Sequence, residues 1–271
     1  MLFKIAIKNL FGAKLRTGLN VFVTSISFFL VIFVSGMYDG MREYAKNITI
    51  ETEVAGGTYW HPEYDSMDPR TFEDSHSVIP SQVRKLIDQK NAFGVLVSQA
   101  SIYPNGRIMP VIMKGITPDQ NIVNMPTNIL AEHNDITIPV LIGSGMAKNA
   151  NLKVGDTFTI RWLDADRTYD ADEGTIVHIM ETENFKLDHG HIWIPLSKAQ
   201  SMLAMENQAT YVTYAKELPM IKDSGDWIHH DVDYMIRDME ALIKADEPGA
   251  QVMYSIPVSY THLTLPTNRE V

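Results

Sequence analysis

The sequence contains no cysteine among its 271 residues. This absence excludes a disulfide framework, a thiolate metal site and a cysteine nucleophile. An extracytoplasmic location stays compatible with it, because disulfides are permitted there but not required. Hydrophobic residues make up 45% of the sequence, so a chain of this length can bury a substantial core without disulfide bonds. The length suits one large domain or two small ones.

Charged residues are also missing from Thr17 to Tyr38. About 20 helical residues cross the hydrocarbon core of a bilayer, so this stretch predicts a transmembrane helix at 17–38. The residues before it carry four basic side chains and no acidic one: Lys4, Lys8, Lys14 and Arg16. The charges after it have mixed signs and begin with Asp39, Arg42 and Glu43. The positive-inside bias therefore predicts a cytoplasmic N-terminus and an extracytoplasmic domain from residue 39 onward.

Residues 1–16 predict a basic amphipathic segment on the cytoplasmic face. Its apolar residues can share one helical face, with lysines beside them; these are Leu2, Phe3, Ala6, Leu10 and Phe11. The alternative is that the segment is only the start of the span. A cleaved signal peptide is a second alternative, but its apolar core usually has about 7–15 residues. The apolar run here is longer and no clean cleavage site follows it, so we expect an uncleaved helix.

The rest of the chain is acidic. The formal net charge is −10, and the first 16 residues contribute +4, which leaves −14 for the remainder. Phosphate contacts need clustered lysine and arginine side chains. Nucleic acid is therefore not an expected partner.

The pattern after the span predicts an α+β domain, because helices and strands interleave without a regular βαβ period. The helical spacing continues to about Ile50 and stops at Gly56-Gly57. A loop is expected at 61–79 and an acidic turn at 164–174. Strands are predicted at 58–60, 93–102, 108–116, 139–142, 157–163, 175–180, 192–194, 210–214 and 251–254. Helices are predicted at 80–91, 146–147, 197–205 and 228–245.

Motifs for ATP binding and for nucleophilic catalysis are missing. No segment has the G-x-x-x-x-G-K-[ST] spacing of a phosphate loop, and no G-x-S-x-G elbow occurs. The string from Gly143 to Lys148 is glycine-rich, but its spacing favours a tight turn from a strand into a helix. We therefore expect a non-catalytic chain and assign no catalytic or cofactor-binding residue.

Three polar clusters could suggest a metal site. Asp188-His189-Gly190-His191 offers two imidazoles, but no motif places further ligands, so a polar hairpin turn is favoured. His229-His230-Asp231 is expected at a helix start, where acidic residues complement the helix dipole. Asp164–Glu173 resembles a calcium loop loosely, but Tyr169 stands where glycine is required, so a solvated acidic hairpin is expected. No metal ligand is assigned.

We expect residues 258–271 to differ in origin from the rest of the chain. Their first ten residues correspond to the reading frame GTC TCT TAT ACA CAT CTG ACG CTG CCG ACG, which resembles a transposon end and adapter used in sequencing libraries. We therefore expect this tail to form no part of the natural fold. We expect the natural protein to continue beyond about Pro257.

Three strings of residues, in order along the chain, carry a resemblance to a protein family. The first is Asn9-Leu10-x-x-x-Lys14-Leu15-Arg16-Thr17-x-Leu19, which runs into the span. The second is Met113-Lys114-Gly115-Ile116-Thr117-Pro118. The third is Pro139 to Ala147, followed by Leu152-Lys153-Val154-Gly155-Asp156-Thr157. Together they resemble permeases of the MacB/FtsX/LolC–LolE type, the membrane subunits of certain ABC transporters, over residues 1 to about 257.

The resemblance implies an architecture and a set of partners. Such permeases have one helix, a large periplasmic domain and three further helices, in the bacterial inner membrane. This would make residues 39–257 a MacB-like core domain. It implies a separate cytoplasmic ABC ATPase subunit, a second permease copy or paralogue, membrane lipid, and a periplasmic protein or lipoprotein as cargo. The implied activity is transmission of ATP-driven motion to the periplasmic domain, for export or lipoprotein release.

Two other functions stay open at this point. One is a single-span anchored binding or sensor domain, and the other is an anchored hydrolase. Three further apolar spans after residue 257 in the intact gene would favour the permease, whereas a stop codon there would favour the sensor. Loss of an activity on mutation of His189 or His191 would be needed to support the hydrolase.

Overall fold

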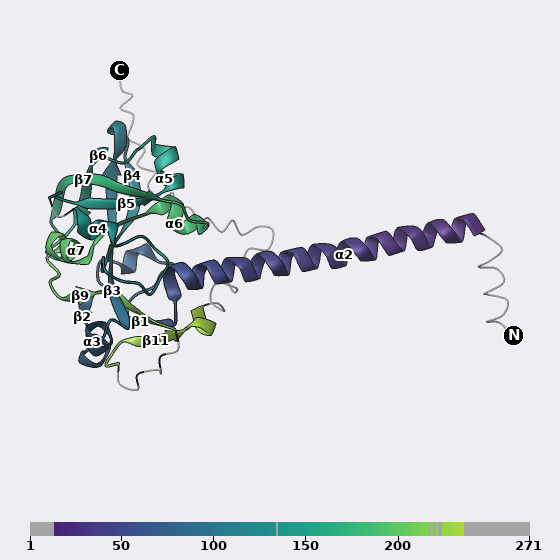
Figure 1. Ribbon diagram of the computed structural model, residues 1–271, viewed down its shortest axis with the longest axis horizontal. Helices are drawn as coiled ribbons and strands as arrows, with labels where there is room; N and C mark the ends of the chain where they lie inside the picture. The colour runs from purple at the N-terminus through teal and green to yellow at the C-terminus, as the bar shows by residue number, and fades with distance from the viewer. Residues whose placement is uncertain (1–13, 134, 217, 219–220, 222–223, 236–271) are drawn as a thin grey trace, which may run out of the picture. The chain divides into compact units, whose positions relative to one another are not determined.

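The computed structural model describes residues 14–235, apart from 134, 217, 219–220 and 222–223 (Figure 1). The chain divides into two compact units, Met1–Asn47 and Ile48–Val271. The predicted strand at 251–254, the tail at 258–271 and most of the segment at 1–16 lie outside the described residues.

Helix α2 (Lys14–Thr49) accounts for the described part of the first unit. It contains the whole predicted span at 17–38, and within the described residues it is the helix long and apolar enough to cross a membrane. The hydroxyls of Thr24 and Ser27 donate to carbonyl oxygens four residues earlier, at 2.8 and 2.9 Å. These bonds satisfy the hydroxyl groups inside the helix, which explains how an apolar span tolerates them.

The second unit is built on a mixed sheet. Among the described residues its strand order is β11-β1-β10-β3-β4-β8-β5-β7-β6. Its strands are β1 (Gly57–Trp60), β3 (Ala92–Tyr103), β4 (Met109–Ile116), β5 (Pro139–Gly143), β6 (Thr157–Leu163), β7 (Tyr169–Met180), β8 (His191–Pro195), β10 (Tyr211–Tyr214) and β11 (Ile228–Asp231). The β4–β8 and β5–β7 pairs are parallel, and the other pairs are antiparallel. The α+β prediction is confirmed.

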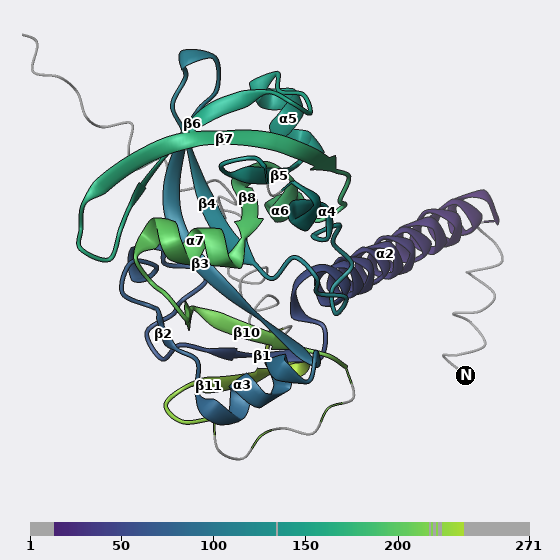
Figure 2. The same ribbon diagram turned by 60° about the vertical axis from the view of Figure 1, so that its left-hand side comes forward.

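Strand β3 belongs to two parts of this sheet at once. Its residues 92–95 pair with β10, its residues 95–102 pair with β4, and its residues 100–103 pair with β6. The β3–β6 pairing joins the two ends of the series β3-β4-β8-β5-β7-β6, so these six strands close into a barrel (Figure 2). Strands β10, β1 and β11 extend the sheet from the other half of β3.

The buried core follows this division. One cluster draws apolar residues from all six barrel strands and includes Leu96, Met113, Ile142, Ile160, Ile176 and Ile192. A second cluster includes Trp60, Phe93, Val97, Leu141, Trp193 and Tyr211. A third includes Tyr59, Val83, Val212 and Trp227. Strand β6 alternates exposed and buried residues along its length, as expected of a strand with one face on the core.

Short helices and turns cover the sheet. They are η1 (Ile50–Val54), η2 (Pro69–Thr71), α3 (Ser81–Asp88), η3 (Pro104–Gly106), α4 (Ile129–Glu132), α5 (Ser144–Ala150), α6 (Phe185–Gly190) and α7 (Leu196–Leu203), with β2 (Ser77–Val78) and β9 (Gln208–Ala209) forming a two-stranded sheet. Helix α7 lies so close to β4 that a Cβ on Gly115 would come within 2.4 Å of the Cβ of Ala199. Only glycine permits that approach.

Most predicted elements match, and four do not. The expected acidic turn ends early, because β7 already begins at Tyr169. Residues 228–231 are a strand rather than the start of a helix. Helix α7 begins after Pro195 with no side-chain cap, one residue before the predicted start at 197. The loop at 61–79 contains η2 and β2.

We predict that Gly143→Ala destabilises the second unit. A Cβ at this position would lie 2.5 Å from the backbone of Asp188 on helix α6. The backbone dihedrals of Gly143 suit any residue (φ −79°, ψ 156°), so the whole effect arises from overpacking, about 1–3 kcal/mol. The measurement is guanidinium unfolding of the full chain in detergent. Gly40→Ala, which meets no atom within 4 Å, is the control and should not destabilise; equal effects would contradict the prediction.

Candidate functional site

The chain leaves helix α2 through a π-helical turn, Ile50–Val54, which we call the exit turn. The N–H of Ala55 donates to the carbonyl of Ile50 at 2.8 Å and closes the turn. Ala55 is buried and has φ 49° and ψ −106°, a conformation that favours glycine and costs about 1–3 kcal/mol. π-Helical turns of this kind occur frequently at functional sites. Such a backbone persists only where surrounding contacts hold it.

Main-chain contacts hold the exit turn against the sheet and a neighbouring loop. The carbonyl of Glu51 accepts a hydrogen bond from the N–H of Asn124 at 2.8 Å. The carbonyl of Glu53 accepts one from the hydroxyl of Thr213 on β10 at 3.3 Å. The N–H of Gly56 donates to the carbonyl oxygen of Tyr214, also on β10, at 2.9 Å. The chain then enters β1, so its path from the exit turn is fixed on both sides.

A buried ion pair adds a side-chain contact. The Nζ of Lys114, near the end of β4, lies 2.9 Å from the Oε1 of Glu53 in the exit turn, and the two side chains are 8% and 21% exposed. The same Nζ lies 5.9 Å from the ring centre of Tyr211, at the distance of a cation–π contact. Tyr64 stacks on that ring with 5.7 Å between ring centres. The ammonium group therefore has an anion and aromatic faces around it in a largely desolvated place.

The surroundings keep Lys114 charged. Burial alone would lower the pKa of Lys114, but the carboxylate of Glu53, with Tyr211 and Tyr64, raises that pKa well above its ordinary value. Burial also raises the pKa of both tyrosines, so they stay neutral. Because the lysine pKa is raised by folding, its stabilising effect is complete at neutral pH. That effect is lost only as the pH rises beyond about 10.4 toward the folded pKa.

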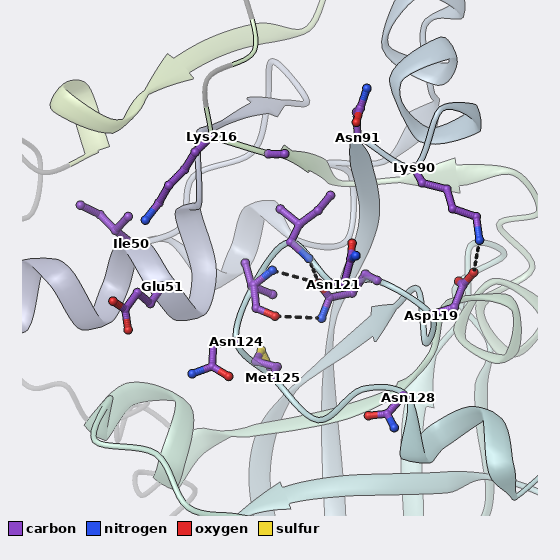
Figure 3. Close-up of a pocket in the computed structure, with 14 residues that line it drawn as sticks. Ile50, Glu51, Lys90, Asn91, Asp119, Asn121, Asn124, Met125, Asn128 and Lys216 are labelled. Carbon is purple, nitrogen blue, oxygen red and sulfur yellow. Dashed lines mark hydrogen bonds and ion pairs between the residues drawn. The ribbon is translucent and has the colours of Figure 1, made fainter.

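An open groove lies beside the exit turn (Figure 3). It encloses about 1000 Å³ and is lined by the exit turn, the loop at 119–128, and residues at the ends of α3 and β10. Gln120 shapes that loop: its side-chain oxygen accepts from the N–H groups of Ile122 and Val123 at 2.9 and 3.0 Å, and its side-chain nitrogen donates to Thr127 at 3.0 Å. The loop is therefore held from within, with its other amide side chains left at the groove.

The glycine-rich string forms the predicted turn. Gly143 ends β5 and the next residue begins α5, which confirms a strand-to-helix turn. Helix α6 packs against this turn, with Asp188 touching the positions of Gly143 and Gly145. The expected hairpin at 188–191 is wrong, because Asp188 and His189 belong to α6 and His191 begins β8.

The other two polar clusters also lie in strands or a turn. His229 and His230 lie in β11, where His229 contacts the hydroxyl of Tyr214 at 2.8 Å. A helical turn follows from residue 232, and the carboxylate of Asp231 accepts a hydrogen bond from the N–H of Tyr234 at 2.6 Å, so the expected acidic cap at a helix start is confirmed for Asp231 but not for the two histidines. The acidic residues of 164–173 form a tight turn and the exposed start of β7. Among the described residues, no group of three or more histidine, aspartate or glutamate side chains is placed to hold a metal ion.

Sequence reasoning missed the Glu53–Lys114 pair. Lys114 belongs to a family-like string, whereas no motif contains Glu53. The available signal was a single lysine inside the apolar strand at 111–116, because a buried lysine is almost always paired.

The comparisons with known proteins are sparse. No family model matches the chain, and no curated protein matches it. The periplasmic region of MacB from Actinobacillus actinomycetemcomitans matches with a TM-score of 0.45 and 10% identity, over 71% of this chain and 95% of that one. The extracellular domain of the noncanonic ABC-type transporter YknZ from Gram-positive bacteria matches with a TM-score of 0.37 and 10% identity, over 69% and 94%. At these values the likenesses assign no function to the chain.

We predict that Lys114→Met destabilises the second unit by about 3–5 kcal/mol, because it leaves the partly buried Glu53 carboxylate without its cation. The double variant Lys114→Met/Glu53→Leu should recover most of that loss, since no unpaired charge remains. Guanidinium unfolding of the full chain in detergent measures both.

The control is Lys90→Met, which removes an exposed ion pair with Asp119 at 3.7 Å and should cost less than about 1 kcal/mol. A Lys114→Met cost as small as that of the control would show that the buried pair does not stabilise the fold. A double variant Lys114→Met/Glu53→Leu no more stable than Lys114→Met would lead to the same conclusion.

Proposed function

We propose that this chain is the membrane subunit of an ABC transporter of the MacB/FtsX/LolC–LolE type. In this role α2 crosses the membrane, the N-terminus is cytoplasmic, and residues 39–257 form the extracytoplasmic domain. ATP hydrolysis in a separate cytoplasmic subunit moves that domain, for export or lipoprotein release. A second permease copy or paralogue completes the membrane part.

The places where the three family-like strings fall support this proposal. The first runs into α2 and the third covers β5, α5 and the turn into β6. The second, Met113 to Pro118, covers the end of β4 and contains Lys114, the partner of the exit turn. Two of the strings thus supply the span and the residue that holds the chain leaving it.

The observation that carries the proposal is the fixation of the exit turn. Hydrogen bonds and one buried ion pair tie residues 51–56 to β4, β10 and the 119–128 loop. A displacement of the chain at the end of α2 would therefore be passed to two strands rather than absorbed in a loop. A tether that only held a domain near a membrane would not need these contacts.

The alternative function is a single-span anchored binding or sensor domain. The groove beside the exit turn favours it, because a binding domain needs a site of this kind. Purification of the full chain from its own membranes distinguishes the two: a co-purifying ATP-binding-cassette subunit with vanadate-sensitive ATPase activity supports the permease. Purification of the chain without such a subunit supports the sensor.

We predict that replacing Tyr44-Ala45 by Gly-Gly uncouples ATP hydrolysis from movement of the domain. Two adjacent glycines weaken a helix by roughly 1 kcal/mol each, so the helix would bend before the exit turn moves. Movement is followed by energy transfer from a dye on Glu206→Cys to acceptor lipids in nanodiscs with the ATPase present. The cysteine-free sequence makes this label specific.

The expected result is unchanged ATP hydrolysis with loss of the ATP-dependent change in energy transfer. The control places Gly-Gly at Asp166-Arg167, a turn in which Arg167 already has φ 60°, and should keep the change. An ATP-dependent change in energy transfer of wild-type size in the Tyr44-Ala45 variant would contradict the proposed transmission of movement through α2.

A further inference from the structure

The groove beside the exit turn is rich in side-chain amides. Asn91, Asn121, Asn124 and Asn128 line it, and within the described part of the chain their side chains make no hydrogen bond. Each carboxamide can donate and accept. Figure 3 shows Asn124 and Asn128 along the loop at 119–128, whereas the side chain of Asn91 points away from that loop. The loop side of the groove thus offers both kinds of hydrogen-bonding group.

Among the described residues of the lining, the formal charges cancel. Glu51 and Asp119 carry negative charge, and Lys90 and Lys216 carry positive charge. The Lys90–Asp119 charges are already paired at 3.7 Å. A groove with no net charge, in an acidic chain, does not favour an anionic or a strongly cationic ligand. The chemistry of the lining favours an uncharged ligand with many hydrogen-bonding groups.

The apolar part of the lining narrows the class of uncharged ligand that fits the groove. It consists of aliphatic side chains and methionine: Ile50, Ile122, Val123, Met125 and Ala215. None of the described residues that line the groove is aromatic, so among them a sugar would have no flat surface on which to stack. Extended polypeptide alternates main-chain donors and acceptors with small side chains on alternate faces, which matches carboxamides interspersed with aliphatic contacts.

We propose that the groove binds an extended, uncharged stretch of polypeptide through its main-chain amide groups. The open shape suits a segment that continues at both ends. Its volume, about 1000 Å³, is at the upper end of the roughly 300–1,000 Å³ of small-molecule sites. Carboxamides of Asn124 and Asn128 exchange hydrogen bonds with peptide bonds, and the aliphatic residues contact the side chains between them.

Because the groove lies beside the exit turn, a peptide bound in it would contact that turn. Ile50 and Glu51 form one wall and belong to the exit turn, and the N–H of Asn124 bonds the carbonyl of Glu51. A bound peptide therefore contacts the exit turn and the loop that holds it. Peptide binding itself does not require an ATPase, so an experiment on the groove tests this proposal independently of the transporter proposal.

The test uses the full chain in nanodiscs and a pool of fluorescent, N-acetylated, C-amidated hexapeptides of alanine, serine, valine and glutamine. Fluorescence anisotropy measures binding. We expect saturable binding that weakens at least tenfold in Asn124→Leu/Asn128→Leu. A second pool with N-methylated main chains keeps the side chains and removes the donors, so it should bind at least tenfold more weakly.

The control variant is Gln82→Leu, a half-buried amide on α3 outside the groove, which should bind the peptide pool as the wild type does. Equal affinity for methylated and unmethylated pools would overturn main-chain recognition. So would an absence of saturable peptide binding, or binding that the asparagine substitutions leave unchanged. Binding of maltoheptaose in place of the peptides would assign the groove to carbohydrate instead.

Discussion

The buried ion pair between Glu53 and Lys114 is the contact on which the arrangement around the exit turn depends. An ammonium group on a central barrel strand needs an anion close by, and Glu53 in the exit turn provides it at 2.9 Å. If the exit turn moved away, Lys114 would stay desolvated without compensation, at a cost of several kcal/mol. This cost makes the exit turn a fixed part of the second unit and holds the strained conformation of Ala55 beside it.

The groove and the ion pair share the same short segment of chain. Glu51 faces the groove, and Glu53, two residues later, faces Lys114. A ligand that binds better to one position of the exit turn would shift that turn, and a displaced turn would change the affinity for the ligand by the same factor. In a transporter this would link cargo or partner binding to the helix. In an anchored sensor it would link binding to the membrane span.

Much of the fold could be predicted from the sequence, because burial repeats at the period of each element. The uncharged run of α2 and the strands that form most of β3, β4 and β6 were all predicted. The start of β7 was not, since both faces of residues 169–173 are exposed and no alternation marks them. Strand β11 carries two histidines and an aspartate at the edge of the sheet, which resembles a helix start more than a strand. The ion pair joins residues far apart in the sequence, so only the topology could bring them together.

The most direct test of this account is hydrogen exchange of the full chain in nanodiscs, comparing the wild type with Glu53→Gln. The substitution keeps the shape of the side chain and removes the charge that Lys114 needs. If the ion pair fixes the exit turn, the amides of Ala55 and Gly56 should exchange faster, while those of β5 and β7 keep their protection. Unchanged exchange at Ala55 and Gly56, or an equal loss of protection throughout the barrel, would contradict the claim that this pair holds the exit turn to the sheet.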